Sequence, residues 1–304
     1  MNTNTMRHLI SITDLTTNDI NAIFQRTDQI LHDGFQPTLA HTVIATLFFE
    51  PSTRTRLSFE TGILRSGGRV ISVTDPAATS TTKGETLEDT VRVISSYVDA
   101  IVLRYPEAGA ASRAAIVSTV PVINAGDGTG EHPTQSLYDL YTIRQALGRT
   151  DHFHIVCLGN LKYYRATRSL VRLLARYPNV TMTFVSAPEL AMKTDILDEL
   201  TQQGINYQVT TNLTSVLPTA DVVYQTRMQK EWLSDTEYQR LKDQYIITPS
   251  VAAQMKPGAI IMHALPRVNE ISPTVDSLPQ AYYFKQAALG MPVRAALLQY
   301  WLQT

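Results

Sequence analysis

The sequence predicts an α/β protein built from two open parallel sheets. Short β-branched runs alternate with helical patterns along all 304 residues, a length that suits two domains of about 150 residues each. Strands that are apolar throughout and joined by helices form parallel sheets. Eight such strands could instead close one barrel, but the glycine-rich break at residues 124–130 favours two separate sheets.

The individual elements follow from these patterns in chain order. Strands are expected at residues 43–49, 69–73, 100–103, 120–124, 154–158, 181–185, 222–224 and 259–262. Helical spacing marks residues 86–97, 133–147, 165–176 and 193–203. The helix at 133–147 ends before Gly148, which is a typical C-cap residue. We expect this helix to bridge the two domains.

The composition excludes several classes of function. A net charge of −1 and 44% hydrophobic residues describe a globular protein without bulk attraction to nucleic acid or membranes. No run approaches the roughly 20 apolar residues that span a bilayer. The N-terminus does not read as a signal peptide, so the cytoplasm is the expected compartment. The single cysteine, Cys157, lies in an apolar run and is expected to be a buried structural thiol rather than a nucleophile or zinc ligand.

The segment Ser52-Thr53-Arg54-Thr55-Arg56 predicts an anion site. It follows the first strand and Pro51, and Ser52 is placed to cap the helix that begins here. Two arginines in the first turns are mildly unfavourable for the helix dipole, which favours anions at this end. Free backbone N–H groups, hydroxyls and guanidiniums at one helix N-terminus describe a phosphate site. The alternative is a surface cap with solvated arginines.

Polar clusters follow six of the predicted strands, at the edge where open parallel sheets bind ligands. The clusters are Arg54 with Thr55, Arg104, His132, Lys162 with Arg165, Arg227 with Gln229, and residues 263–267. Because several arginines have no matching carboxylate cluster, we expect a substrate with several negative charges.

The polar loop at residues 79–85 reads either as a mobile surface loop or as a lid whose Lys83 reaches a phosphate. It lacks the GxxxxGK[ST] pattern, and residues 126–130 lack the GxGxxG spacing of a dinucleotide site. The histidines show no HExxH spacing, so metal catalysis is not expected.

Together these segments resemble the signatures of the aspartate/ornithine carbamoyltransferase family. Residues 49–56 (FEPSTRTR) resemble its carbamoyl-phosphate signature, and residues 132–135 (HPTQ) resemble its shared motif. The aspartate branch is resembled by residues 83–90 (KGETLEDT), 159–165 (GNLKYYR), 226–231 (TRMQKE) and 263–267 (HALPR). The resemblance runs from about residue 15 to the C-terminus.

The resemblance implies a carbamoyl-phosphate-binding domain at residues 1–134, completed by a C-terminal helix at 290–304 that packs back on it. Residues 135–289 would form the aspartate-binding domain. It also implies a homotrimer with shared active sites, in which a neighbouring subunit donates the loop from Ser80 to Lys83. It implies no metal and no organic cofactor, and it leaves open whether regulatory chains or a dihydroorotase bind the trimer.

The implied reaction is attack of the L-aspartate α-amine on carbamoyl phosphate, which gives N-carbamoyl-L-aspartate and phosphate, the second step of de novo pyrimidine biosynthesis. The phosphate would be bound by Ser52, Thr53, Arg54, Thr55 and Arg104. The carbonyl would be polarised by Thr55, Arg104 and His132, while the carbamoyl NH₂ would be held by Gln135 and the carbonyls near Ala264 and Leu265. The aspartate ligands would be Lys83, which also bridges to the phosphate, Arg165 for the α-carboxylate, and Arg227 with Gln229 for the β-carboxylate.

Several positions depart from the aspartate-branch pattern. Ala264 stands where proline is usual, Tyr164 where glycine is common, and Arg168 where histidine is common. Thr79 and Ser80 compete for the role of the lid serine. The alternatives are therefore a sister carbamoyltransferase with another amino-acid or ureido acceptor, or a non-catalytic anion-binding regulatory protein on the same fold. The cation at Arg227 favours a dicarboxylic acceptor over ornithine.

Overall fold

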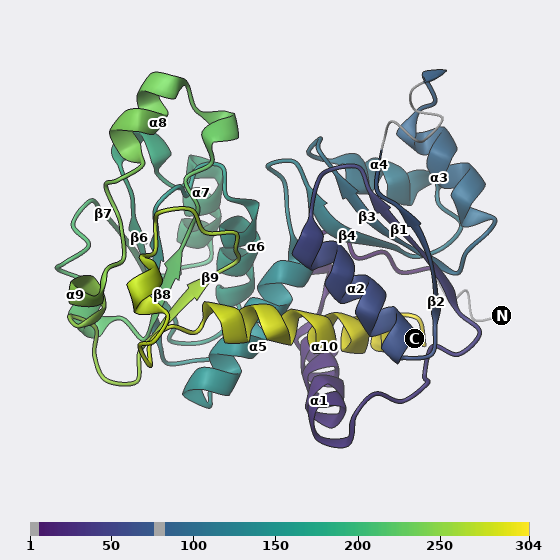
Figure 1. Ribbon diagram of the computed structural model, residues 1–304, viewed down its shortest axis with the longest axis horizontal. Helices are drawn as coiled ribbons and strands as arrows, with labels where there is room; N and C mark the ends of the chain where they lie inside the picture. Colours follow the sequence, from purple (N-terminus) through teal and green to yellow (C-terminus); the bar gives the residue numbers. More distant parts are fainter. Residues whose placement is uncertain (1–5, 76–82, 304) are drawn as a thin grey trace. The chain divides into compact units, whose positions relative to one another are not determined.

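Two parallel-sheet α/β units make up the protein. The computed structural model describes residues 6–75 and 83–303 (Figure 1). Unit 1 takes the described residues up to Tyr138 and those from Leu289 onward, and unit 2 runs from Asp139 to Ala288. Every strand pair in both sheets is parallel, so the prediction of two open parallel sheets is confirmed and the barrel is excluded.

Unit 1 contains a four-stranded sheet in the order β2-β1-β3-β4. Its elements are α1 (Thr17–Asp33), β1 (Val43–Phe48), α2 (Thr53–Arg65), β2 (Arg69–Val73), α3 (Leu87–Ser95), β3 (Ala100–Tyr105), α4 (Ala110–Val117) and β4 (Val122–Asp127). Alternate side chains of β1 serve the two faces, as a strand requires. Ala45 and Leu47 join a core with α3 and α4, whereas Thr46 donates a hydrogen bond to Glu60 of α2.

Unit 2 contains a five-stranded sheet in the order β7-β6-β5-β8-β9. Its elements are β5 (His154–Leu158), α6 (Arg165–Leu174), β6 (Thr181–Val185), α7 (Thr194–Gln202), β7 (Tyr207–Thr210), β8 (Val222–Gln225), α8 (Asp235–Leu241), α9 (Pro249–Ala252) and β9 (Ile260–His263). Short 3₁₀ turns complete the described chain at Ile12–Asp14, Pro188–Leu190, Leu217–Thr219, Lys230–Trp232 and Pro273–Val275.

Two helices have residues in both units. The helix α5 (Pro133–Leu147) leads from unit 1 into unit 2, as the sequence predicts, and α10 (Tyr283–Trp301) leads back (Figure 1). The helix α10 starts at Tyr283, before the predicted start at residue 290, and contains Pro292, and its part from Leu289 onward belongs to unit 1. A proline removes one backbone hydrogen bond, but the helix continues because residues 293 and 295–298 are fully buried.

Each sheet has one point where the strand order reverses. In unit 1 the reversal lies between β1 and β3, and in unit 2 it lies between β5 and β8. The connections that leave neighbouring strands at such a point turn to opposite faces of the sheet, which opens a crevice at the carboxyl ends. The predicted polar clusters follow these four strands, with further clusters after β4 and β9.

The single cysteine is structural, as expected. Cys157 on β5 is fully buried, and burial raises the pKa of its thiol to about 12. Within the described part of the chain, no helix is both long and apolar enough to cross a membrane.

A buried carboxylate ties the first and last helices of unit 1 together. Asp19 on α1 is 4% exposed. It accepts hydrogen bonds from Thr16, from Arg7 at 3.0 Å and from the Tyr300 hydroxyl at 2.7 Å. Burial alone would raise the pKa of this carboxyl, but the hydrogen bonds from Tyr300, Thr16 and Arg7 outweigh it and lower the pKa from 3.8 to about 2.

We expect Asp19→Asn to destabilise unit 1 at pH 7 by about 2 kcal/mol. The pKa of Asp19 is lower in the folded chain, so its stabilisation is complete above pH 3.8 and is lost as the pH falls toward about 2. Urea unfolding of variant and wild type should therefore differ at pH 7 and converge near pH 2. Asp33→Asn, at the exposed end of the same helix, is the control and should change stability by less than about 0.5 kcal/mol. A constant difference between Asp19→Asn and wild type across this pH range would contradict the role of the charge.

Candidate functional site

The N-terminus of α2 presents an arginine and has no side-chain cap among the described residues. Ser52 occupies the N-cap position, but its side chain makes no capping hydrogen bond, so the prediction that Ser52 caps this helix is wrong. The Ser52 hydroxyl and the first backbone N–H groups of α2 therefore make no hydrogen bonds with each other. Arg54 is exposed and makes no ion pair within the described residues, whereas Thr55 is buried. Donors without internal partners at a helix N-terminus favour an anion.

Arg104 lies beside this helix end and is held in place. It stands opposite Phe48 in the register of β1 and β3. Its guanidinium donates to Glu50 Oε1 at 3.0 Å and to the carbonyl of Ala125 at 3.3 Å. The residue is only 9% exposed. Arg104 therefore offers a fixed, partly shielded charge at the switch point of unit 1.

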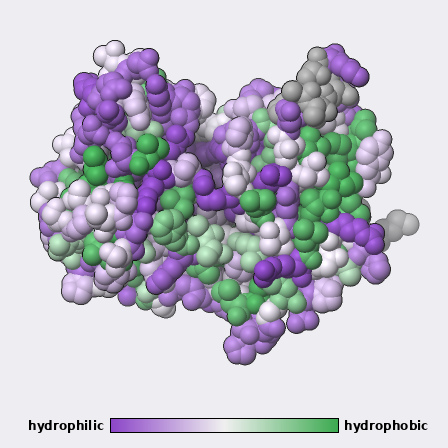
Figure 2. Space-filling model, in the orientation of Figure 1, coloured by the Kyte–Doolittle hydropathy of each residue, from purple (hydrophilic) through white to green (hydrophobic). Residues whose placement is uncertain are grey.

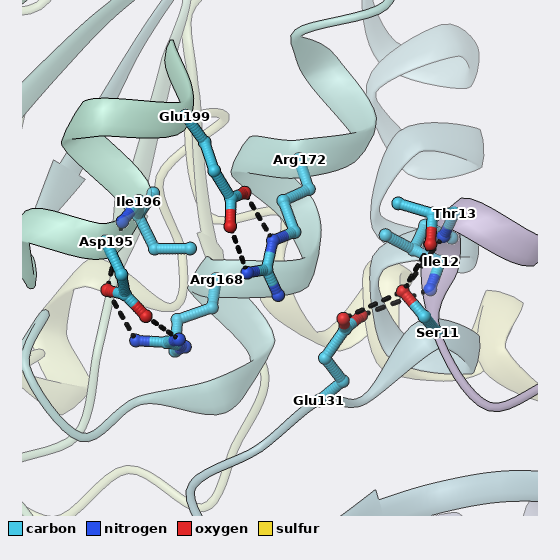
Figure 3. Close-up of polar contacts among 9 residues, drawn as sticks. All are labelled: Ser11, Ile12, Thr13, Glu131, Arg168, Arg172, Asp195, Ile196 and Glu199. Carbon is cyan, nitrogen blue, oxygen red and sulfur yellow. Dashed lines mark hydrogen bonds and ion pairs between the residues drawn. The ribbon is translucent and has the colours of Figure 1, made fainter. Parts of the chain in front are cut away.

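The connection from β4 to α5 is a rigid loop. Asp127 accepts hydrogen bonds from the backbone N–H of Gly109 at 2.8 Å and of Glu131 at 2.9 Å. Gly128 has φ +46°, and a β-carbon there would lie 2.6 Å from a backbone nitrogen, so the turn requires glycine. Glu131 in turn accepts the Ser11 hydroxyl at 2.8 Å (Figure 3).

This rigid loop sets where α5 begins. The predicted site residues His132 and Gln135 are both buried there, in and just before the first turn of the helix. The glycine-rich segment thus ends β4 and leads directly into the helix start that carries His132 and Gln135.

In unit 2, the N-terminus of α6 carries Arg165, while the next two arginines on this helix pair with α7. Arg168 donates to Asp195 at 2.6 Å, and Arg172 contacts Glu199 through two hydrogen bonds of 2.7 and 2.5 Å (Figure 3). Burial alone would raise the pKa of Asp195, but Arg168 lowers it. The charge of Arg168 therefore joins two helices. Tyr164, the other unusual neighbour of Arg165, occupies the N-cap position of α6, and its side chain makes no capping hydrogen bond.

The connections that follow β5 and β8 lie against each other. Gly159 has φ +107°, and a β-carbon there would lie 2.7 Å from the Thr226 hydroxyl, which itself donates to the carbonyl of Leu158. Further along, Tyr163 stacks on Trp232 with ring centroids 6.1 Å apart. These contacts bring Lys162 and Arg165 of one connection near the segment that carries Arg227 and Gln229.

Arg227 is half-buried and forms an ion pair with Glu231. Burial alone would lower the pKa of Arg227, but the hydrogen bonds to Glu231 raise it, so the guanidinium remains charged. Gln229 Oε1 is buried and has no hydrogen-bond partner among the described residues. The charged guanidinium of Arg227 suits a ligand carboxylate, and the Oε1 atom of Gln229 suits an N–H donor on the same ligand.

The expectation that the arginines lack carboxylate partners is wrong. Arg104 pairs with Glu50, Arg227 with Glu231, and Arg267 with Asp276. None of these three partners was predicted from the sequence, although the spacing of four residues between Arg227 and Glu231 is typical of an ion pair on one helical face. Arg54 is therefore the cation that most favours a polyanionic ligand.

The proposed lid is described only in part. Thr79 and Ser80 lie outside the described residues, and Lys83 is exposed at the start of the second described range. Ala264 and Leu265 follow β9, where Leu265 has φ +54°. Across residues 6–75 and 83–303, no group of three or more His, Cys, Asp or Glu side chains is placed to hold a metal ion.

Family models match nearly the whole chain. One, for the aspartate/ornithine carbamoyltransferase carbamoyl-P binding domain, matches residues 7–145, and one for the Asp/Orn binding domain matches residues 151–301. The aspartate carbamoyltransferase catalytic subunit of Vibrio cholerae serotype O1 is 46% identical over 96% of this chain and 95% of its own. The catalytic subunit of Clostridium kluyveri is 43% identical over 96% of both chains.

Solved structures of aspartate transcarbamoylase are similar to this chain over nearly its whole length. The catalytic subunit of M. jannaschii aspartate transcarbamoylase superposes with a TM-score of 0.90 at 45% identity, covering 98% of both chains. Aspartate transcarbamoylase from Trypanosoma cruzi in complex with carbamoyl phosphate and aspartate gives 0.89 at 35% identity, covering 97% of this chain and 95% of that one. Fold and site thus define a two-domain α/β protein with cationic side chains after the strands at two sheet switch points. The chain belongs to the aspartate/ornithine carbamoyltransferase family.

Proposed function

We propose that this chain transfers the carbamoyl group of carbamoyl phosphate to the α-amine of L-aspartate, giving N-carbamoyl-L-aspartate and phosphate, as in de novo pyrimidine biosynthesis. The observation that carries the proposal is Arg54 at the N-terminus of α2, which has no side-chain cap, together with the Arg104 guanidinium that Glu50 holds at the end of β3. The relatives named above at 43–46% identity are aspartate carbamoyltransferases. The substrates named for the Trypanosoma cruzi structure are the same pair.

On the carbamoyl phosphate side, unit 1 supplies the donors. Ser52, Thr53, Arg54 and the N–H groups of α2 bind the phosphate, because this helix end favours an anion. Thr55, Arg104 and His132 donate to the carbonyl oxygen as it gains charge in the tetrahedral intermediate, and donors of this kind are worth about 3 kcal/mol each. The departing phosphate takes the proton of the attacking amine, so His132 needs only to donate.

On the acceptor side, unit 2 supplies the cations. Arg165 binds the α-carboxylate, and Arg227 with Gln229 binds the β-carboxylate.

Gln135 and the carbonyls of Ala264 and Leu265 hold the carbamoyl NH₂. A neighbouring subunit donates Lys83 and Ser80, which contact the phosphate and the aspartate. Holding both substrates in place supplies the orientation term of the catalysis.

The proposed assembly is a homotrimer in which the subunits share active sites. The proposed compartment is the cytoplasm. Unit 1 exposes large apolar side chains along α2 and the edge strand β2: Leu57 is 47%, Leu64 61% and Ile71 48% exposed. Figure 2 shows apolar side chains gathered over the β2 edge of this unit. Apolar patches of this kind mark protein contacts, which supports self-association. Regulatory chains or a dihydroorotase are further partners to be sought. The solution mass of the protein, measured both for the purified protein and in lysate, would reveal them.

The test is phosphate release from carbamoyl phosphate with L-aspartate, with L-ornithine and with no acceptor. We expect fast, saturable release with aspartate, together with stoichiometric N-carbamoyl-aspartate. Release with ornithine but not with aspartate would identify a sister enzyme. We do not expect release with ornithine, because Arg227 should repel its cationic side chain. No acceptor-dependent release at any pH would point to a non-catalytic anion-binding protein.

A further inference from the structure

A chain of buried hydrogen bonds runs through unit 2 to the segment after β9. We call it the relay, and its members are Tyr224, Asp139, Gln286, His263 and Glu270. Tyr224 donates to Asp139 Oδ2 at 2.8 Å, and Gln286 donates to Asp139 Oδ1 at 2.7 Å. The backbone N–H of His263 donates to Gln286 Oε1 at 2.8 Å. None of the five side chains belongs to a residue more than 3% exposed.

The imidazole of His263 is held in one tautomer. The backbone N–H of Leu265 lies 2.7 Å from Nδ1, and an amide N–H can only donate, so Nδ1 carries a lone pair. The ring proton therefore sits on Nε2, which donates to Glu270 Oε1 at 2.8 Å. Both ring nitrogens are thus engaged with the protein.

Glu270 holds the far side of the same turn. Its Oε2 accepts the backbone N–H groups of Val268 at 3.1 Å and Asn269 at 3.2 Å. Burial alone would raise the pKa of Glu270, but the hydrogen bond from His263 and these backbone donors lower it, so the carboxylate stays charged. One carboxylate thus fixes His263 and the end of the turn at once.

The turn that these residues enclose has an unusual backbone. Leu265 lies in the left-handed region with φ +54°, where a side chain crowds its own backbone. Such a conformation persists where the surroundings determine it. The bond from Leu265 N–H to His263 supplies that restraint directly.

We propose that His263 and Glu270 are positioning residues for carbamoyl transfer: the His263 imidazole, held by Glu270 as its Nε2–H tautomer and anchored by the relay, fixes the Leu265 backbone. The inference rests on the proposed function, in which the carbonyls of Ala264 and Leu265 hold the carbamoyl NH₂. Neither ring nitrogen of His263 takes part in the chemistry, because both are already bonded. The relay instead sets the direction of the Ala264 and Leu265 carbonyls, which orient the carbamoyl group that the amine attacks.

The test compares Glu270→Gln with Asp221→Asn. Asp221 is a buried carboxylate at the opposite end of the same sheet, where it accepts the His154 N–H and pairs with Lys256, both at 2.8 Å. We expect Glu270→Gln to lower kcat about 100-fold, since a misplacement near 1 Å has an effect of that order, with KM for aspartate changed less than about twofold. Asp221→Asn should lower the melting temperature but leave kcat within about twofold of wild type.

A graded set at His263 separates positioning from bulk stability. His263→Asn places an amide oxygen near the position of Nδ1 and can still accept the Leu265 N–H, so it should retain about tenfold more kcat than His263→Ala. Equal kcat in these two variants, wild-type kcat in Glu270→Gln, or equal kcat losses in Glu270→Gln and Asp221→Asn would overturn the proposal.

One measurement needs neither folded variants nor activity. Nitrogen-15 NMR of the wild-type histidines at pH 7 should show His263 neutral with its proton on Nε2. A proton on Nδ1 would overturn the positioning role even if every variant failed to fold. If the wild type showed this tautomer but released no phosphate with aspartate, the proposed function would fail while the structural role of the relay stood.

Discussion

Arg54→Ala should lower turnover about 100-fold or more while the protein remains folded. Arg54 is exposed, makes no ion pair within the described residues, and stands at a helix end without a side-chain cap. Removing it therefore costs little stability, but it removes a cation from the phosphate as negative charge shifts toward the leaving group. A loss of about 3 kcal/mol in transition-state stabilisation corresponds to this factor. Steady-state kinetics with both substrates, beside circular dichroism, would measure it.

The matched control is Arg56→Ala, two residues further along the same helix. Arg56 lies 3.7 Å from Glu60 one turn away, so its charge is engaged within α2. We expect Arg56→Ala to keep kcat within a few-fold of wild type. If both variants lost turnover equally, or if Arg54→Ala stayed near normal, the assignment of the phosphate site to Arg54 would be wrong.

Arg227→Ala should raise KM for aspartate about 10- to 100-fold and change KM for carbamoyl phosphate little. A charge-assisted hydrogen bond is worth about 1.5–3 kcal/mol, which gives this range. The free enzyme pairs Arg227 with Glu231, so the substrate carboxylate must share or replace that carboxylate. Glu231→Gln should accordingly move KM for aspartate less than Arg227→Ala does.

Arg240→Ala provides the comparison for Arg227. Arg240 also pairs with a glutamate in unit 2, Glu189 at 2.8 Å, but both side chains are about half exposed on the surface. Exposed pairs contribute about 0–1 kcal/mol, and no substrate role is assigned to Arg240. An unchanged KM for aspartate in Arg227→Ala, or the same increase in Arg240→Ala, would remove the β-carboxylate role from Arg227.

The local segments of the site were predictable because their signals are short in sequence. An apolar strand, Pro51 and a polar helix start together define the turn before α2, and the structure places α2 at Thr53–Arg65. The strands at 69–73, 154–158 and 181–185 match their predicted bounds for the same reason. By contrast, β7 was missed, since it is a four-residue edge strand with no buried side chain and thus carries no apolar signal.

The sequence by itself determined the fold class, the bridging helix and the family, because strand periodicity, turn residues and clustered motifs are encoded within a few neighbouring residues. Only the tertiary structure decided which charges are already neutralised and which groups hold the turn at Leu265. Asp139 meets Tyr224 across 85 positions and Gln286 across 147, so no local pattern could reveal the relay. Burial in the interior of unit 2 makes those distant hydrogen bonds strong and their absence costly.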